Sequence, residues 1–253
     1  MSIAIVTGAS SGIGQELAKQ LKDFIEAEEI WVIARREERL LALKEICGLP
    51  VRALPLDLTD LGSISLLEQE LKAAGKPVSV LINCAGYGKF GNYDDIAPAD
   101  ATGMIDLNAR ALVAVTNAVL PFMERGSRIL QVCSISAFLP VPLINVYAAT
   151  KVFVLHYSRG LSVELKPRGI TVTALCPGWV DTAFFKTATD TKNPKAVTNY
   201  TFMQTPERVA KQGLKAMRKG RLTSIVGFQN KILYVLTRIL PVKFVMWVWT
   251  KVQ

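Results

Sequence analysis

Short apolar runs rich in β-branched residues recur along the chain and alternate with longer segments of helical periodicity. A run of this kind, bounded by turn residues, is typical of a strand buried in a sheet. Seven runs fit the pattern: Ile3–Thr7, Ile30–Ile33, Val51–Pro55, Val78–Ile82, Arg128–Cys133, Ile170–Ala174 and Ser224–Val226. The segments between them are long enough to carry the chain back across a sheet, so the pattern predicts parallel strands joined by helices.

Length and composition favour one α/β domain over 1–253. The chain has 253 residues, half of them hydrophobic, and its Pro and Gly residues are spread along it rather than gathered in a linker. This composition excludes a disordered chain. In a parallel α/β sheet ligands bind beyond the carboxyl ends of the strands, where we expect the functional residues.

A glycine-rich turn, Thr7-Gly8-Ala9-Ser10-Ser11-Gly12-Ile13-Gly14, follows the first predicted strand and precedes an amphipathic helical segment. Glycines allow a tight turn and a close approach of backbone amides to a ligand. The pattern therefore indicates a pyrophosphate site at a helix N-terminus. The alternative is a tight strand-to-helix connection without a ligand.

The end of the second predicted strand reads Ala34-Arg35-Arg36. In NAD-selective sites a carboxylate at about this distance from the glycine turn binds the ribose 2′-hydroxyl, whereas an arginine receives the 2′-phosphate of NADP. A small residue followed by Arg35 predicts NADP(H), because a guanidinium can pair with the phosphate in bidentate fashion. The alternative for Arg36 and Arg39 is a helix-start pairing with Glu37 or Glu38.

Tyr147 and Lys151 lie four residues apart on the helical segment after the fifth strand. This spacing places both side chains on one helix face. A nearby ammonium favours the phenolate form of a tyrosine, so the pair suits acid–base chemistry. By itself the pair is weak evidence, since helices place tyrosine and lysine four apart by chance.

Together these motifs resemble the short-chain dehydrogenase/reductase family over residues 1 to about 185. The matching segments are Thr7–Gly14, Asn83-Cys84-Ala85-Gly86, Asn108, Ser134, Tyr147 with Lys151, and Pro177-Gly178-Trp179-Val180-x-Thr182. The resemblance implies a Rossmann-type, doubly wound, seven-stranded parallel sheet with helices on both faces, in one domain that carries both cofactor and substrate. It also implies hydride transfer between NADP(H) and a carbonyl/alcohol pair, by an enzyme acting on CH-OH groups.

The resemblance also implies catalytic roles. Ser134 would hydrogen-bond the substrate oxygen, and Tyr147 would exchange the proton with it. Lys151 would hold the nicotinamide ribose hydroxyls and tune the tyrosine, while Asn108 would bind a water that continues the proton relay. The chain has Cys133-Ser134 where the family often has a serine pair, so Ser136 could share or take the role of Ser134.

The same resemblance assigns the cofactor contacts. Asp57 would touch the adenine amine, the segment from Asn83 to Gly86 would line the adenosine side, and Thr182 would reach the nicotinamide carboxamide. Asn83 is also the residue expected to brace the sheet. The full set of expected cofactor residues is Gly8, Ser10, Ser11, Gly12, Ile13, Gly14, Arg35, Asp57, Leu58, Asn83, Ala85, Gly86, Tyr147, Lys151, Pro177, Gly178, Val180 and Thr182.

Aromatic residues near the expected site favour an apolar substrate pocket. The expected substrate residues are Ser134, Ser136, Phe138, Trp179 and Phe184, with plain core packing as the alternative for the aromatic ones. A hydrophobic ketone, aldehyde or acyl thioester is favoured over a sugar.

Charge is concentrated in the last quarter of the chain. Residues 186–253, which we expect to cover the substrate and form the C-terminal segment, hold 13 Lys and Arg against Asp190 and Glu207, a net +11. Within 228–253, Ile232, Val235, Leu236 and Ile239 form an apolar helical stripe, and Pro241 interrupts the pattern before Trp247 and Trp249. The segment is too interrupted to span a bilayer but suits a membrane interface. The alternatives are packing on the domain or a subunit interface, in a homodimer or homotetramer.

The remaining features of the sequence limit the kinds of function that we expect. The sequence starts directly in an apolar strand, which together with four sparse cysteines predicts a cytoplasmic protein with reduced thiols. Association of this cytoplasmic protein with a membrane is the alternative. No metal-ligand spacing and no nucleic-acid recognition module are visible. The alternative functions are a reductase of lipid or acyl-carrier-bound substrates at a membrane surface, and a non-catalytic nucleotide sensor.

Overall fold

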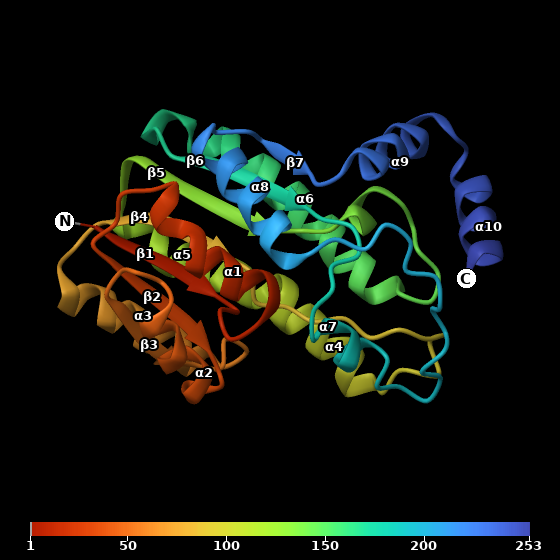
Figure 1. Ribbon diagram of the computed structural model, residues 1–253, viewed down its shortest axis with the longest axis horizontal. Helices are drawn as coiled ribbons and strands as arrows, with labels where there is room; N and C mark the ends of the chain where they lie inside the picture. Colours follow the sequence, from red (N-terminus) through yellow and green to blue (C-terminus); the bar gives the residue numbers. More distant parts are fainter. Residues whose placement is uncertain (1) are drawn as a thin grey trace.

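The computed structural model describes residues 2–253 and contains one sheet of seven parallel strands (Figure 1). The strand order is β3-β2-β1-β4-β5-β6-β7, so the chain moves outward in one direction from β1 and in the other from β4. This reversal opens the ligand crevice of a doubly wound sheet at the carboxyl ends of β1 and β4. The strands are β1 Ile3–Thr7, β2 Glu29–Ala34, β3 Val51–Pro55, β4 Val78–Asn83, β5 Met123–Val132, β6 Thr171–Cys176 and β7 Thr223–Ile225.

Helices cover both faces because successive strand side chains point to opposite sides. In β1, Ala4 and Val6 join one apolar core, whereas Ile3 and Ile5 join the other. The first core is closed by α1 (Gly12–Gln20), α2 (Glu37–Leu41) and α8 (Pro206–Arg218). The second is closed by α3 (Leu61–Ala74), α5 (Leu112–Val119) and α6 (Asn145–Glu164). The predicted Rossmann-type sheet is thereby confirmed.

All seven predicted strands are present, and only β5 differs clearly in its bounds. It begins at Met123 instead of Arg128, because Val78 pairs with Met123 while Val80 pairs with Arg128. The extra residues form a bulge in which the Ser127 hydroxyl donates to the Val78 carbonyl. Glu124 and Arg125 are polar and exposed, so the apolar pattern did not include this part of the strand.

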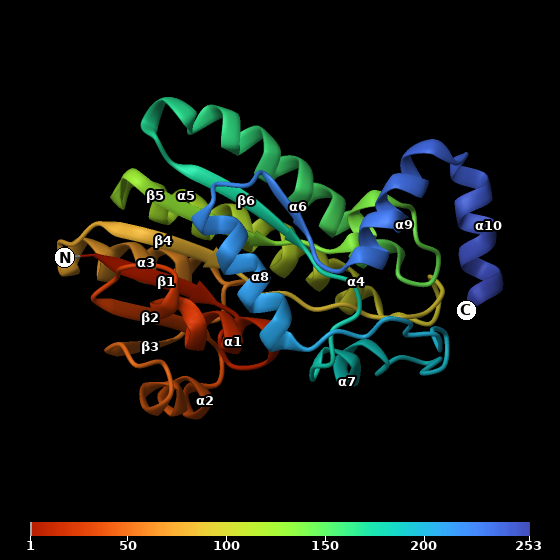
Figure 2. The same cartoon turned by 45° about the horizontal axis from the view of Figure 1, so that its top comes forward.

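The remaining helices lie toward the carboxyl ends of the strands. They are α4 (Pro98–Ile105), α7 (Phe184–Ala188), α9 (Phe228–Ile239) and α10 (Val242–Val252). Short 3-10 helices occur elsewhere in the fold, at Leu21–Asp23, Ala42–Glu45, Leu120–Phe122, Ile135–Phe138 and Lys166–Arg168. Figures 1 and 2 show α9 and α10 beyond the sheet, at the end toward which the strand arrows point. Pro241 separates the two helices, as the sequence pattern predicted. In residues 2–253, no helix combines the length and the apolar character needed to cross a bilayer.

Candidate active site

A cavity of about 1330 Å³ runs along the carboxyl ends of the strands and continues to α9 and α10. This exceeds the 300 to 1,000 Å³ that is usual for a small-ligand pocket, so it has room for more than one bound group. Among the residues expected at the site, Asn83, Asn108 and Phe138 do not line this cavity. The others do: Gly8, Ser10, Ser11, Gly12, Ile13, Gly14, Arg35, Asp57, Leu58, Ala85, Gly86, Ser134, Ser136, Tyr147, Lys151, Pro177, Gly178, Trp179, Val180, Thr182 and Phe184.

The turn between β1 and α1 has no room for side chains at Gly8 and Gly14 and little room at Gly12. A Cβ at Gly14 would lie 2.2 Å from the Gly8 carbonyl oxygen, and one at Gly8, where φ is +67°, would lie 2.7 Å from the Ala85 nitrogen. A Cβ at Gly12 would meet the Thr182 methyl group at 3.0 Å. The Ser11 side chain does not cap α1, so the first-turn N–H groups remain available to an anion in the cavity. The turn is thus a backbone cradle that fits a pyrophosphate.

Three exposed arginines, Arg35, Arg36 and Arg39, line the cofactor end of this cavity. The Arg36 guanidinium donates to the Ser10 hydroxyl oxygen over 3.1 Å, which links it to the glycine turn. Asp57 also lines this part of the cavity, and the backbone N–H and hydroxyl of Thr59 donate to its carboxylate. These hydrogen bonds, helped by the charge of Arg35, hold the pKa of Asp57 below its ordinary value. The carboxylate therefore stays ionised beside the arginines.

The residues beneath the cavity brace the strand ends. The Thr7 hydroxyl oxygen accepts hydrogen bonds from the backbone N–H groups of Cys84 and Ala85, joining β1 to the end of β4. The buried Asn83 amide donates to the Thr116 hydroxyl on α5 over 3.0 Å. Asn83 thus lies in a bracing position below the cavity, and only its neighbours Cys84, Ala85 and Gly86 reach the lining.

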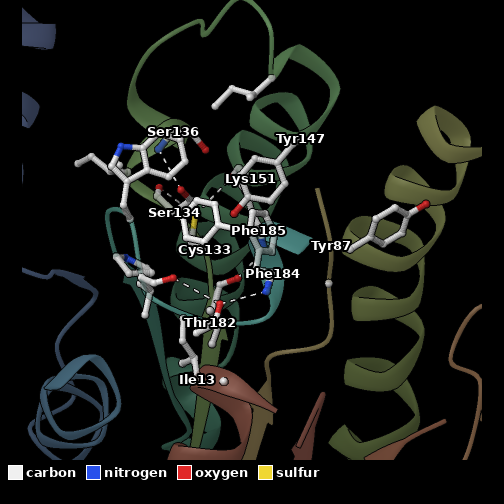
Figure 3. Close-up of a pocket in the computed structure, with 18 of the residues that line it drawn as sticks. Ile13, Tyr87, Cys133, Ser134, Ser136, Tyr147, Lys151, Thr182, Phe184 and Phe185 are labelled. Carbon is white, nitrogen blue, oxygen red and sulfur yellow. Dashed lines mark hydrogen bonds between the residues drawn. The ribbon is translucent and has the colours of Figure 1, made fainter. Parts of the chain in front are cut away.

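Tyr147, Lys151 and Ser134 come together beside this cradle. Tyr147 and Lys151 lie on α6, with the Lys151 ammonium nitrogen 5.6 Å from the centre of the Tyr147 ring. Lys151 is held there by donating to the Val132 carbonyl oxygen over 2.9 Å. Ser134 follows β5, and its hydroxyl oxygen accepts from the Ser136 backbone N–H over 3.2 Å. Figure 3 shows the three side chains pointing toward one another.

The surroundings of Tyr147 and Lys151 change the proton affinity of both groups. Removal from bulk water raises the pKa of the Tyr147 phenol above its ordinary value, while its hydrogen bond with Ser134 opposes this rise. Burial also lowers the pKa of the Lys151 ammonium. The sequence suggested that Lys151 would lower the pKa of Tyr147, but in this structure the pKa is raised, and desolvation of the phenol is the largest cause. Tyr147 is therefore protonated at neutral pH in this structure and is available as a proton donor.

Asn108 lies in a π-helical turn, Asp106–Ala111, directly behind the lysine. Its amide oxygen accepts from the Tyr87 backbone N–H, and its amide nitrogen donates to the Tyr87 carbonyl and to the Thr150 hydroxyl. A Cβ at Gly86 would lie 2.8 Å from the Asn108 amide oxygen and 3.6 Å from the Lys151 ammonium nitrogen. Asn108 thus ties the loop after β4 to α6 next to Lys151, and its expected role in a water relay stays a prediction.

An aromatic wall closes the substrate side. The centre of the Phe184 ring lies 5.5 Å from the centre of the Tyr147 ring. The centre of the Phe90 ring lies 6.1 Å from that of Phe184 and 5.9 Å from that of Trp179. Ser136, Trp179 and Phe184 line the cavity here, as expected. Phe138 does not, because its ring packs on Tyr234 of α9 at 4.6 Å. Phe138 therefore supports the wall from behind.

Lys89 is a residue that the sequence did not single out. Its side chain is buried, and its ammonium donates to the carbonyl and carboxylate oxygens of Asp190 and lies 3.4 Å from an Asp100 oxygen. These contacts join the loop after β4 to the segment after α7, over the aromatic wall. Asp190 is 101 residues away in the chain, so no local pattern could have indicated the pairing.

The cysteines are all free thiols, and three of them lie at strand ends near the site. Cys84 and Cys133 line the cavity, while Cys176 is fully buried at the end of β6. Burial raises the pKa of Cys84 to about 12 and that of the distant Cys47 to about 11, so neither is a thiolate at neutral pH. Within residues 2–253 there is no group of three His, Cys, Asp or Glu side chains that could hold a metal ion.

Comparisons with known proteins identify the family of the chain. The family model described as short chain dehydrogenase matches residues 2–193. A sulfoacetaldehyde reductase 2 from Chromohalobacter salexigens is 35% identical over an alignment that covers 72% of this chain and 74% of the relative. A very-long-chain 3-oxoacyl-CoA reductase-B from Danio rerio is 31% identical, covering 95% of this chain and 76% of the relative.

One solved structure is similar to the chain in its fold and, to a lesser degree, in its sequence. It is a short-chain dehydrogenase from Sphingobium yanoikuyae in complex with NADPH, which is 25% identical and superposes with a TM-score of 0.78. The match covers 95% of this chain and 97% of that protein. The similarity therefore extends over the whole sheet and its helices.

Proposed function

The chain belongs to the short chain dehydrogenase family, and from that premise we propose that it is an NADP(H)-dependent oxidoreductase interconverting a hydrophobic carbonyl compound and its alcohol. The observation that carries the proposal is one continuous cavity. Its lining joins the glycine cradle at Gly8–Gly14 to Ser134, Tyr147 and Lys151. A cofactor held in the cradle and a substrate held at Tyr147 would therefore meet in one cavity.

The choice of NADP(H) over NAD(H) is supported by charge. Ala34 stands where a carboxylate would bind the ribose 2′-hydroxyl, and Arg35, Arg36 and Arg39 all line this end of the cavity. Three guanidiniums near a phosphate give strong charge-assisted hydrogen bonds. The relative from Sphingobium yanoikuyae, solved in complex with NADPH, is consistent with this choice.

The chain's own residues supply the proton chemistry. The dinucleotide, when bound, supplies or accepts the hydride. The Ser134 hydroxyl oxygen accepts from the Ser136 backbone N–H, which holds this hydroxyl next to Tyr147, where it would donate to the substrate oxygen. The protonated Tyr147 phenol then gives its proton to that oxygen during reduction and takes it back during oxidation. Lys151, held by the Val132 carbonyl, places a positive charge beside the phenol and stabilises the phenolate that forms.

A hydrophobic substrate is supported by the aromatic wall around Tyr147. Phe184, Phe185 and Trp179 line the cavity next to it, together with Leu139 and Ile144. The names of both relatives describe reduction of a carbonyl compound, one a small sulfonated aldehyde and the other a very-long-chain thioester. The shared carbonyl chemistry supports the reaction type for this chain, and the apolar wall supports a hydrophobic tail on the substrate.

A screen of aliphatic, aromatic and polycyclic ketones and aldehydes, following NADPH absorbance, tests the proposal. We expect turnover of at least one hydrophobic class and little turnover of sugars. The competing function, a non-catalytic nucleotide sensor, predicts tight NADPH binding without oxidation by any member of the panel. Binding measured in parallel by NADPH fluorescence separates the two outcomes.

Membrane contact through residues 228–253 is a second proposal, supported by the outer face of α9. Phe228, Ile232, Val235 and Ile239 form an exposed stripe on this face that does not line the cavity. Lys231 and Arg238 are exposed and border the stripe by helical spacing. An amphipathic helix with basic residues beside its apolar face suits an anionic bilayer surface.

Charge favours a membrane over a second copy of the chain at this stripe. Residues 208–253 contain ten Lys and Arg and no Asp or Glu. A symmetric contact through α9 would bring Lys231 and Arg238 of that helix close to their own copies, whereas anionic lipid would neutralise them. A homodimer or homotetramer would instead use another surface, for which the exposed Val152, Phe153 and Val163 of α6 are the candidates.

A further inference from the structure

The catalytic cavity does not end at the aromatic wall but continues into a groove between α9 and α10. Leu233, Leu236 and Leu240 line it from α9 and its end. Phe244, Val245, Val248, Trp249 and Val252 line it from α10. From Leu233 to Leu240 the chain advances by seven residues, which corresponds to about 10 Å along a helix. The cavity at Tyr147 therefore opens into a long apolar channel.

Helix α9 is apolar on two sides, and only one of them faces this channel. Leu233 and Leu236 line the cavity, whereas Ile232 and Val235 lie on the outer stripe, and all four are exposed aliphatic side chains. An apolar side that merely packed a helix onto its domain would be buried by protein, but α9 and α10 contain no buried residue. The inner side is thus an apolar surface left uncovered next to the catalytic residues.

The two helices are nevertheless fixed in place. Tyr234 of α9 packs on Phe138, and the Trp249 indole N–H donates to the Pro142 carbonyl over 2.9 Å while its ring lies 6.5 Å from Trp179. At the end of α10 the Gln253 side-chain oxygen accepts from the Thr198 backbone N–H. Both walls of the groove are therefore anchored to the domain.

The groove offers apolar contact and few free polar groups. Its lining from α9 and α10 includes no charged residue, and the polar members are Gln229, Asn230 and Thr237. The Asn230 amide already donates to the Val226 carbonyl, and the Thr237 hydroxyl donates to the Tyr234 carbonyl. A ligand that fits here is long and apolar, with its polar group at the Tyr147 end.

We propose that this groove is the binding subsite for a long unbranched aliphatic chain attached to the substrate carbonyl. The inference rests on the proposed carbonyl chemistry and names its substrate class. The carbonyl oxygen lies at Ser134 and Tyr147, and the chain passes the aromatic wall and lies between the leucines of α9 and the valines of α10. Each methylene that enters the groove leaves water and covers exposed aliphatic surface, which supplies the binding free energy.

A homologous series of straight-chain 2-ketones from four to twelve carbons, each below its critical aggregation concentration, tests this. With NADPH present, kcat/KM is expected to rise about twofold per added methylene, less than for full burial because the groove is open on one side. Titration of the same ketones against tryptophan fluorescence gives Kd values that do not depend on turnover. Trp179 and Trp249 both line the channel and report its occupation.

Two variants on the same helix provide a matched comparison. Leu236 lines the groove and is 43% exposed, and Ile232 lies outside it and is 47% exposed. Leu236→Gln is expected to flatten the dependence of both kcat/KM and Kd on chain length. Ile232→Gln is expected to keep the wild-type dependence.

The outcomes separate this inference from the proposed function. If short ketones are reduced but chain length has no effect, or if both variants behave alike, the groove does not bind the chain and the reductase activity stands. If no ketone is reduced while Kd still falls with chain length in a Leu236-dependent way, the subsite stands and the reaction type is wrong. A Kd independent of chain length in the wild-type protein overturns the subsite whatever the activity.

Discussion

The Lys151 ammonium donates to the backbone carbonyl of Val132 over 2.9 Å, which joins α6 to the last residue of β5. Because Ser134 lies two residues beyond Val132, this contact also fixes the distance between the lysine and the serine. The burial that makes the contact possible lowers the pKa of Lys151 and raises that of Tyr147. One packing arrangement thus sets both the geometry and the proton affinities of the site.

Replacing Tyr147 tests its role as proton donor. Tyr147→Phe is expected to lower kcat by about 10²- to 10⁴-fold, the usual contribution of a general acid, while the Kd for NADPH changes little. Lys151→Ala is expected to lower kcat and to raise the Kd for NADPH, since the lysine would contact both the phenol of Tyr147 and the ribose of the cofactor. Stopped-flow hydride transfer and NADPH fluorescence titration measure the two effects. A Tyr147→Phe enzyme that retains most of its turnover would show that another group donates the proton.

The direction of the Tyr147 pKa shift predicts opposite pH profiles for the two reactions. Reduction needs the protonated phenol, so kcat/KM for the carbonyl is expected to stay level through neutral pH and to fall only above pH 10, the ordinary tyrosine value. Oxidation needs the phenolate, so kcat/KM for the alcohol is expected to rise throughout the alkaline range. Profiles measured with saturating cofactor test this. A reductive profile that already falls near pH 7 would contradict the raised pKa.

Arg35 is predicted to carry the preference for NADPH. Arg35→Ala is expected to raise the KM for NADPH about tenfold, because a charge-assisted hydrogen bond contributes about 1.5 kcal/mol. The KM for NADH should hardly change, since that cofactor lacks the 2′-phosphate. Initial-rate kinetics with both cofactors provide the internal control. Equal use of NADPH and NADH by the wild-type enzyme would refute the assignment before any mutation is made.

Two helical glycines provide a test of the phosphate cradle. A Cβ at Gly14 would lie 2.2 Å from the Gly8 carbonyl oxygen, whereas a Cβ at the exposed Gly160 of α6 would meet nothing within 4 Å. Gly14→Ala is expected to lower Tm and abolish NADPH binding, because the backbone of the turn must move. Gly160→Ala is expected to stabilise the protein by about 1 kcal/mol, since alanine favours a helix. Thermal unfolding with and without NADPH measures both. Wild-type NADPH affinity in Gly14→Ala would disprove the cradle.

The outer stripe of α9 is expected to bind anionic vesicles. Each basic residue near the surface adds about 1 kcal/mol, and burial of the apolar stripe adds a part that resists salt. Co-sedimentation should therefore weaken with salt without vanishing, and neutral vesicles should bind only as weakly as anionic vesicles do at high salt.

The variants Ile232→Gln and Leu236→Gln also test vesicle binding, and here Leu236→Gln is the control. Ile232→Gln should weaken vesicle binding about tenfold, because an apolar side chain no longer leaves water, while Leu236→Gln should not. Absence of binding to anionic vesicles at low salt would exclude the membrane proposal. Size-exclusion chromatography of the same variants shows whether the stripe instead joins two copies.

Local pattern determined much of the fold and part of the site. The seven strands follow from apolar runs of a few residues, and the turn at Gly8–Gly14 and the helical spacing of Tyr147 and Lys151 lie within single short segments. Such features depend on neighbours in sequence, through backbone freedom and side-chain periodicity, and so they can be recognised without a structure.

Other features were decided only by the tertiary structure, because they depend on which distant residues exclude water from a group. The sequence indicated that Lys151 acts on Tyr147, but the direction of the phenol's pKa shift follows from burial by the whole site. The pairing of Lys89 with Asp190 joins residues 101 positions apart. The apolar stripe predicted in 228–253 placed Leu236 beside Ile232, and only the fold turns one toward the catalytic cavity and the other toward solvent.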